Sequence, residues 1–512
     1  MKNIAIAFFV ICCFSCSNKE QVVSGDFPIV KTKTGLIRGV SSNGIQIFKG
    51  IPYAAPPVND LRWKVPKPVS PWSDTLMCTA YAASPIQNPP EPFRMWTQEF
   101  IAPATPLSED CLYLNIWTPG NIEKEKLPVL VWIHGGAFLS GAASCPVYDG
   151  EAMARKGIVF VSINYRLGIF GFMAHPDLTA ESENKSSGNY GLLDQIQALR
   201  WVKENVSAFG GDPEKVTIAG QSAGSMSVQL LVASPLTKNL LHGAIAQSGA
   251  SANGPSMTLR EAEEIGQSIA EKASVSTIDA LRNLSADSML ALGNTLPFGS
   301  FFPVIDGYVV PENMKETFED RQHRDVPLLA GWVTGDADLS RQEIKSKDDF
   351  KSFVNMNYGE QIEAFLKVFP ADTDELAENS QRRLAVLNFA AFANHVWATS
   401  NTSKSFLYQF SYVPTDKPGF PNYGAFHTSE VPFAYHTLKY WDRPWKESDL
   451  KVEEYMSTYW ANFIKTGNPN SELLPEWKPY DKTSGNIMEL GIEPVIQPGL
   501  FKQEFKLLEN LF

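Results

Sequence analysis

The sequence predicts an α/β fold: a central, mostly parallel sheet with helices on both faces and helical insertions. From residue 127 onward, short apolar runs alternate with segments of helical length, and runs this continuous are typical of strands buried on both faces. One intervening segment places Leu192, Ile196, Leu199 and Val202 at helical spacing, as a helix packed on one face requires. A parallel sheet covered on both faces explains both patterns. The runs are PVLVWI, GIVFVSINY, VTIAG, GAIAQSG and VPLLAGW.

The first 26 residues predict an export signal and a tether. Residues 4–14 are apolar and uncharged, but this run is too short to cross about 30 Å of hydrocarbon, so we expect a signal peptide at residues 1–15. Cys16 and the polar residues after it resemble a bacterial lipoprotein processing site, although the residues before Cys16 depart from the usual pattern. We expect Cys16 to carry the lipid anchor and residues 16–26 to form the tether. Ordinary secretion with cleavage nearby is the alternative.

This interpretation predicts an exported protein, attached to a bacterial membrane through lipid only and facing the periplasm or the cell exterior.

The composition and the motifs of the chain exclude several classes of partner. The chain of 512 residues has 44 basic and 56 acidic side chains and a net charge of -12, which repels phosphate backbones, so no nucleic-acid partner is expected. No CxxC motif or Cys/His spacing suggests a metal, and no cofactor is expected.

Beyond residue 26, the chain has no long Ser/Gly/Pro linker, charge block or fixed-period repeat. We therefore expect residues 27–512 to form a single domain. Its first strands, around residues 29–40 and 44–54, alternate polar and apolar side chains and predict an antiparallel hairpin at a sheet edge. Residues 257–296 and 345–401 are rich in Ala, Glu, Leu and Lys, and we expect them to be helical insertions covering the sheet edge.

A candidate nucleophile lies between a predicted strand and a predicted helix. Residues 220–224 read Gly-Gln-Ser-Ala-Gly, which fits G-x-S-x-G, directly after VTIA and before SMSVQLLVA. In this setting, a tight turn exposes the hydroxyl of Ser222 at a helix N-terminus. Gly220 and Gly224 are explained by the tight turn, which leaves no room for a Cβ.

A serine nucleophile needs a base, and in this architecture the acid and then the histidine follow the serine along the chain. His427 lies in the loop YGAFHTSE, where a side chain can reach over a strand end, and it is the preferred base. His436 is a weaker candidate. His395 lies in the apolar segment FAAFANHVW, which favours a core histidine.

The acid is expected just after the strand VPLLAGW. Asp336 holds the first acidic position beyond Gly335 and is preferred, while Asp338 stays open as the alternative. Asp306, in PVIDG, is better explained as a turn former.

An oxyanion hole needs amides aimed at one point. His134, Gly135, Gly136 and Ala137 immediately follow the strand VLVWI and form a loop of the required kind, because glycines permit close approach of the backbone. His134 is then expected to position this loop.

Taken together, these segments resemble the type-B carboxylesterase family, which includes the cholinesterases, across roughly residues 27–482. The resemblance implies an α/β-hydrolase fold with Ser222 as nucleophile, Asp336 as acid and His427 as base. It also implies oxyanion amides from Gly136, Ala137 and Ala223, and a supporting serine near the acid at Ser248. The matching segments are SEDCLYLNIWTP, WIHGGAF, NYRLG, FGGDPEKVTIAGQSAGS, AIAQSG, PVIDG, GAFHTSEVPF and WANFIKTGNPN.

The sequence departs from the family pattern at three places. Gln221 stands where the family usually has Glu, so a negative charge beside the nucleophile is missing and a preference for cationic esters becomes doubtful. The acid is Asp rather than the commoner Glu. The family's first disulfide implies a bridge between Cys78 and Cys111, although Cys78 lies a few residues before the usual position.

We therefore predict a serine carboxylic-ester hydrolase that forms an acyl-enzyme intermediate and acts on small-molecule esters, with small or aryl esters as the expected substrates. A lipase or amidase variant is one alternative. A catalytically inactive binding or adhesion protein of the same fold is another. Phe301 and Phe302 could line the acyl pocket, but core packing explains them better.

Overall fold

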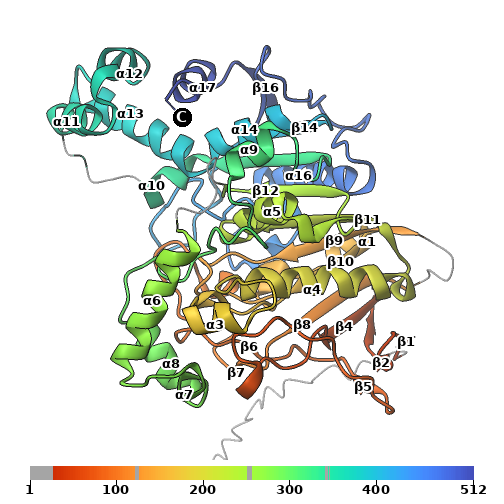
Figure 1. Cartoon of the computed structure of the whole chain (residues 1–512). Coiled ribbons are helices and arrows are strands. Elements are labelled where there is room, and N and C mark those ends of the chain that lie inside the picture. The colour runs from red at the N-terminus through yellow and green to blue at the C-terminus, as the bar shows by residue number, and fades with distance from the viewer. Residues whose placement is uncertain (1–26, 121–125, 251–256, 341–343, 345, 512) are drawn as a thin grey trace, which may run out of the picture.

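The computed structural model describes residues 27–120, 126–250, 257–340, 344 and 346–511. Within these residues, an eleven-stranded sheet runs through the molecule (Figure 1). Its strands, in spatial order, are β16 (Pro494–Pro498), β15 (Asn486–Leu490), β14 (Ser405–Phe410), β13 (Leu328–Val333), β12 (Gly243–Gln247), β11 (Gly211–Gln221), β9 (Leu127–Ile133), β10 (Val159–Ile163), β8 (Tyr113–Pro119), β4 (Ile45–Pro52) and β3 (Val40–Ser42).

Helices lie on both sides of this sheet. In the described part of the chain they are α1 (Glu151–Arg155), α2 (Gly168–Phe172), α3 (Pro176–Glu181), α4 (Tyr190–Asn205), α5 (Ala223–Ala233), α6 (Leu259–Lys272), α7 (Ile278–Arg282), α8 (Ala286–Gly293), α9 (Met314–Glu319), α10 (Ala337–Ser340), α11 (Lys347–Tyr358), α12 (Ile362–Val368), α13 (Asp374–Val386), α14 (Phe392–Ser400), α15 (Val431–Tyr435), α16 (Glu447–Thr466) and α17 (Lys502–Glu509).

The predicted α/β class is confirmed. The strands from β10 through β9 and β11 to β15 pair in parallel, while β8, β4 and β3 at one edge and β16 at the other pair antiparallel. All five apolar runs singled out in the sequence form parallel strands. Burial on both faces explains their continuous hydrophobicity.

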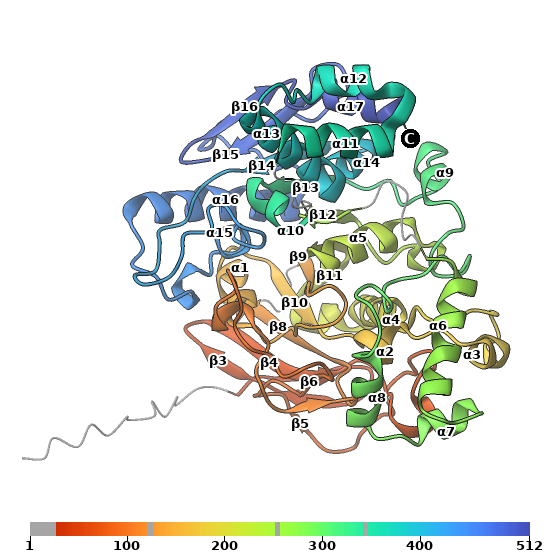
Figure 2. The same ribbon diagram turned by 90° about the vertical axis from the view of Figure 1, so that its left-hand side faces the viewer.

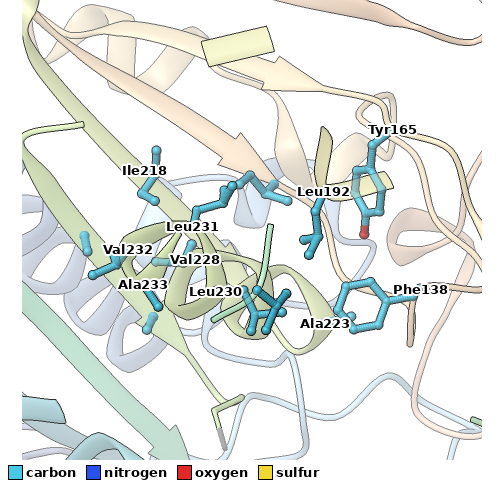
Figure 3. Close-up of a cluster of buried hydrophobic side chains, with 14 of the residues drawn as sticks. Phe138, Tyr165, Leu192, Ile218, Ala223, Val228, Leu230, Leu231, Val232 and Ala233 are labelled. Atoms are coloured by element: carbon cyan, nitrogen blue, oxygen red, sulfur yellow. The ribbon is translucent and has the colours of Figure 1, made fainter. Parts of the chain in front are cut away.

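Strand β9 shows how the two faces are covered. Val129, Val131 and Ile133 belong to a core shared with α4 and α5, whereas Leu130 and Trp132 belong to a second core shared with α1 and α16. Successive side chains of a strand point to opposite faces, so each face has its own helical layer. Figure 3 shows the first of these cores, in which α5 residues pack with Leu192 of α4 and with Phe138 and Tyr165.

The order of the strands reverses between β9 and β11. From β9 the chain crosses to β10 on one side, and from β10 it returns through α4 to β11 on the other side. In open α/β sheets, such a reversal leaves a crevice at the carboxyl ends of the two strands, where ligands bind. The expected oxyanion loop follows β9 and the expected nucleophile follows β11, so both lie at this crevice.

The predicted insertions are helical. Residues 257–296 form α6, α7 and α8. In the second region, the described residues 346–401 form α11 to α14, with a π-helical segment, Leu387–Ala391, joining α13 to α14. Figure 2 shows the first group at one end of the molecule and the second group, packed with α17, at the other. No helix of the described chain has the length and apolarity needed to cross a bilayer.

The prediction of a single N-terminal hairpin is wrong. β1 (Ile29–Lys31) and β2 (Leu36–Arg38) form a hairpin that joins β5 (Leu76–Met77) in a small separate sheet, whereas β3 and β4 form the hairpin at the edge of the main sheet. A further pair, β6 (Ser84–Pro85) and β7 (Leu107–Ser108), lies apart from both. The alternating pattern indicated strands without indicating their partners.

The expected Cys78–Cys111 disulfide is absent, and this prediction is wrong. Cys78, Cys111 and Cys145 are free and buried. The backbone of Cys78 is hydrogen-bonded between β2 and β4, through Arg38 and Lys49, whereas Cys111 shares a small cavity with Ile86. The predicted signal peptide, tether and lipid anchor at Cys16 lie outside the described residues.

Candidate active site

A cavity of about 620 Å³ opens at the carboxyl ends of β9 and β11. It is lined by the loop after β9, by the turn after β11 and by the loop that carries His427. Its volume lies in the range of small-molecule sites. No Lys or Arg side chain lines this cavity in the described part of the chain, and most of its wall is apolar.

Ser222 occupies a strained turn between β11 and α5. Its φ of 58° and ψ of -123° are unusual for a residue with a side chain. A Cβ on Gly220 would lie 2.4 Å from Gly224 C, and one on Gly224 would lie 2.1 Å from Ile133 O. Both glycines are therefore required by close backbone contact, and the turn presents Ser222 at the start of a helix and in the cavity.

The loop after β9 is also strained. Gly136, Ala137 and Phe138 have φ values of 107°, 54° and 59°. Within the described residues, the amides of Gly136, Ala137 and Ala223 donate no hydrogen bond, although the first two follow β9 and the third follows Ser222. These N–H groups are available to a ligand in the cavity, as an oxyanion hole requires.

His134 holds this loop rather than facing the cavity. Its ring stacks on Tyr165 with 4.5 Å between ring centroids, and Nδ1 lies 2.8 Å from Gly135 O. The Tyr165 hydroxyl donates to His134 O at 2.9 Å. Burial lowers the pKa of His134 to about 4, so the ring is neutral at pH 7 and its Nδ1–H can donate to Gly135 O.

His427 and Asp336 form a buried, hydrogen-bonded pair. Nδ1 of His427 lies 2.6 Å from Oδ1 of Asp336, and Oδ2 of Asp336 accepts the N–H of Val333 at 3.1 Å. The backbone fixes both turns, since Gly335 donates its N–H to Ala425 O at 2.9 Å. A Cβ on Gly335 would lie 2.4 Å from that same oxygen. The loop carrying the histidine thus lies directly against the turn carrying the carboxylate.

The competing candidates lie elsewhere. Asp338 forms an ion pair of 2.8 Å with Arg382. His395 is buried between Tyr480 and Glu509, in agreement with a core histidine. His436 lies within 3.8 Å of Glu453 and Glu454. Asp306 accepts three successive backbone N–H groups, as a turn former does.

The expected support from Ser248 is not seen. Ser248 is fully buried at the end of β12, and its N–H donates to Gly331 O at 2.9 Å. Its hydroxyl has no hydrogen-bond partner among the described residues. Among the described residues, the contact of Ser248 with β13 that is hydrogen-bonded is therefore made by its backbone, and the role that the resemblance implied for its hydroxyl stays a prediction.

The structure adds neighbours of His427 that the sequence did not reveal. The amide Nε2 of Gln221 lies 2.9 Å from Nε2 of His427. The rings of Trp96 and Phe389 are both nearly perpendicular to the imidazole, with centroids 6.4 Å and 5.2 Å away, and both residues line the cavity. Phe389 belongs to the π-helical segment, and such segments are frequent at functional sites. No pattern in the sequence predicted that Phe389 lies beside the histidine.

A second carboxyl group lies close to the pair. Glu430 is fully buried three residues after His427, and its Oε1 accepts a hydrogen bond of 3.3 Å from Gln247 Nε2. Its Oε2 has no partner among the described residues. Burial, reinforced by the charge of Asp336, raises the pKa of Glu430 to about 8, so the protonated form of this side chain predominates at pH 7.

Of the two neighbouring phenylalanines, Phe301 lies in the core and Phe302 lies at the cavity. Phe301 is buried in the core, as the sequence favoured. Phe302 lines the cavity and stacks edge-to-face on Phe138, with 5.6 Å between centroids. Core packing therefore explains only the first of the two.

With this geometry in place, comparisons with known proteins identify the family. The model of the family described as the carboxylesterase family matches residues 26–508. The chain belongs to the carboxylesterase family. It is accordingly a carboxylic ester hydrolase with the α/β-hydrolase fold that the sequence resemblance implied.

Individual relatives agree over most of the chain. Fumonisin B1 esterase of Sphingopyxis macrogoltabida is 35% identical over 90% of this chain and 86% of its own length. The para-nitrobenzyl esterase of Bacillus subtilis is 34% identical, over 92% and 96% of the two chains. A solved PNB esterase structure superposes with a TM-score of 0.82 at 31% identity, covering 95% of this chain and all of the other.

Proposed function

We propose that this carboxylesterase works through a Ser222–His427–Asp336 triad and an acyl-enzyme intermediate. The observation that carries the proposal is the 2.6 Å contact between His427 Nδ1 and Asp336 Oδ1, made in the loop that lines the same cavity as Ser222. With Nδ1–H donating to Asp336, Nε2 carries the lone pair that accepts a proton. That nitrogen now contacts the Gln221 amide, and the Ser222 hydroxyl replaces this amide as its donor when the reaction starts.

The proposed reaction has two halves. His427 takes the proton of Ser222 as the hydroxyl attacks the ester carbonyl, and then returns it to the departing alcohol. Water repeats the sequence and releases the acid. Amides of Gly136, Ala137 and Ala223 stabilise the oxyanion in both halves, while Asp336 holds the imidazole tautomer and stabilises its cation.

We propose small or aryl esters as substrates. The cavity of about 620 Å³ is largely apolar, and among the described residues its lining has one acidic side chain, Glu91, and no lysine or arginine. Such a wall suits small, mainly apolar molecules, and a similar relative is a para-nitrobenzyl esterase. The absence of a charge at Gln221 argues against selective binding of cationic esters. A panel of esters that varies the acyl and alcohol parts separately would define the preference of each.

One observation favours a lipase as the second candidate. Phe93 and Phe298 line the cavity and are 57% and 77% exposed, and an apolar entrance of this kind is what an interfacial enzyme needs. A lipase would hydrolyse an emulsified ester much faster than the same ester below its solubility limit. Equal rates per dissolved molecule would exclude this candidate.

Replacing Ser222 by Ala tests the central proposal. Hydrolysis of a short-chain aryl ester should fall to background, and a fluorophosphonate probe that labels the wild-type protein should leave the variant unlabelled. Retention of most of the activity would overturn the triad. A wild-type protein that neither hydrolyses esters nor reacts with the probe would instead support a binding or adhesion role.

We also propose that Cys16 carries a lipid that holds the enzyme on a bacterial membrane. The support is the sequence pattern around Cys16 alone. Labelling with a radioactive fatty acid should mark the wild-type chain and spare the Cys16→Ser chain. Complete retention of the Cys16→Ser chain in the membrane fraction would reject the anchor.

A further inference from the structure

The side chain of Gln87 is hydrogen-bonded to the backbone of Gly141, at the end of the strained loop after β9. Its side-chain Oε1 accepts the N–H of Gly141 at 2.9 Å, while its Nε2 donates to Gly141 O at 2.9 Å and to Pro85 O at 3.0 Å. The side chain is 2% exposed, and all its polar groups are thus engaged. Two parallel hydrogen bonds to one residue fix both the position and the orientation of its backbone.

The segment that carries Gln87 is itself held in place by strand pairing and by side-chain hydrogen bonds. Residues 84 and 85 form β6, which pairs with β7. Asn164 joins the segment that carries Gln87 to the chain just after the loop, since its Nδ2 donates to Ala83 O at 3.2 Å and its Oδ1 accepts the N–H of Ala143 at 2.8 Å. Gln87 therefore acts from a fixed support and not from a loose loop.

The loop that Gln87 holds needs such restraint. Ala137 and Phe138 have left-handed backbone conformations, which cost on the order of 1 kcal/mol or more for a residue with a side chain. Nearby contacts hold the beginning of the loop through Tyr165 and its middle through Gly168, whose N–H donates to Phe138 O at 2.7 Å. Gly141 packs against His134, since a Cβ there would lie 2.6 Å from Nδ1. The hydrogen bonds from Gln87 to Gly141 restrain the end of the loop.

We propose that Gln87 is a positioning residue for the oxyanion hole. By clamping Gly141, it keeps the N–H groups of Gly136 and Ala137 directed at the point where the oxyanion forms. The proposal rests on the function proposed above. Because the amides stabilise charge that develops during the reaction, their misplacement should raise the barrier of the chemical step more than it weakens substrate binding.

The test replaces Gln87 by Met, which keeps a similar length and removes all three hydrogen bonds, and by Glu, which removes both N–H donors but keeps an acceptor for Gly141. Both variants should lower kcat about 10- to 100-fold on an aryl ester and leave KM within about threefold. Their affinity for an aryl boronic acid, which forms a tetrahedral adduct on the nucleophile, should fall by the same factor as kcat/KM.

The matched control is Gln46→Met, because Gln46 also donates to a glycine carbonyl, that of Gly120 at 3.4 Å, but lies outside the cavity lining. This variant should keep wild-type kinetics. A wild-type kcat in either folded Gln87 variant, or a change in KM alone, would overturn the proposal. A failure of the proposed triad is distinguishable, because it would leave Ser222→Ala active whatever the Gln87 variants do.

Discussion

The two sides of the candidate active site differ in what holds their functional groups in place. At the ends of β9 and β11, residues 134–141 and 220–224 are shaped by the main chain, through glycines without room for a Cβ and residues with left-handed backbone. At the end of β13 and in the loop before α15, a backbone contact between Gly335 and Ala425 also sets the approach of the two segments. There, however, the groups expected to act in the reaction are held by side chains, namely the carboxyl groups of Asp336 and Glu430 and their partners.

This difference predicts different modes of failure. In the main-chain half, a single added carbon should disrupt the site, whatever its polarity. In the side-chain half, an isosteric change should leave the shape intact and alter only hydrogen bonding or charge. The following substitutions test the two halves in turn.

Gly224→Ala should have the largest effect. The new Cβ would lie 2.1 Å from Ile133 O, a backbone atom of the central strand, so the elbow must move. We expect loss of measurable esterase activity and a decrease in the free energy of unfolding of about 3 kcal/mol or more. Activity assays and thermal unfolding would measure the two effects.

Gly293→Ala provides the control for this substitution. A Cβ at the end of α8 would make only ordinary contacts of 3.4 Å with Ile169 and Phe301. Activity and stability should both stay near the wild-type values. A Gly224→Ala protein as active as Gly293→Ala would show that the elbow is not sterically fixed.

Asp336→Asn should separate rate from stability. Asn has the shape of Asp but cannot stabilise the imidazolium, and it can present an N–H to His427 in place of an acceptor, so kcat should fall by roughly 10³- to 10⁴-fold. The thermal midpoint should change far less than in Gly224→Ala. Steady-state kinetics and thermal unfolding of the same preparation check both statements.

Asp338→Asn is the matched comparison, since it makes the same chemical change two residues away. It weakens a half-exposed ion pair with Arg382, whose contribution to stability is about 1 kcal/mol or less. Its kcat should stay within about twofold of wild type. If Asp338→Asn proved the more damaging substitution, the acid would have been assigned to the wrong residue.

Glu430→Gln should have the smallest effect at acidic pH and a growing one as pH rises. Folding holds the pKa of Glu430 at about 8, above its value in the unfolded chain, so the folded state binds more protons between about pH 5 and 8 and loses stability as pH rises through this window. Gln mimics the protonated acid and removes this dependence. The variant should gain about 1 to 3 kcal/mol relative to wild type from pH 5 to pH 8.

Denaturant unfolding of both proteins at several pH values measures this difference. The charge of Asp336 and the hydrogen bond from Gln247 act on the Glu430 carboxyl group, and both residues are retained in the variant. Stability curves of wild type and variant that run parallel from pH 5 to pH 8 would contradict a neutral Glu430.

The same contrast explains what could be predicted from the sequence. The elbow around Ser222 and the loop around Gly136 lie within continuous segments, and steric demands on the main chain leave glycines that can be recognised. Asp336 and Asp338 could not be separated in this way, because both follow one strand and only the orientation of a short helical turn distinguishes them. The strands themselves were predictable, since burial on both faces marks them with continuous apolar runs.

Contacts between distant segments escaped prediction. Gln87 lies 54 residues from Gly141, and Gln221 lies 206 residues from His427, so nothing local links them. The Cys78–Cys111 bridge was implied by the family resemblance alone, although Cys78 lies a few residues before the usual position, and no local pattern in the sequence tests such a pairing. Glu430 lies only three residues from His427, but its neutral state depends on burial, which appears only once the chain is folded.

The free cysteines give this fold a built-in reporter. Burial raises the pKa of Cys78 and Cys145 to about 12 and that of Cys111 well above its usual range, so at pH 8 these groups are almost entirely in the unreactive thiol form. An alkylating reagent should therefore modify Cys78, Cys111 and Cys145 only in molecules that have opened. Because no bridge joins these three residues, the folded enzyme should also be insensitive to reductants.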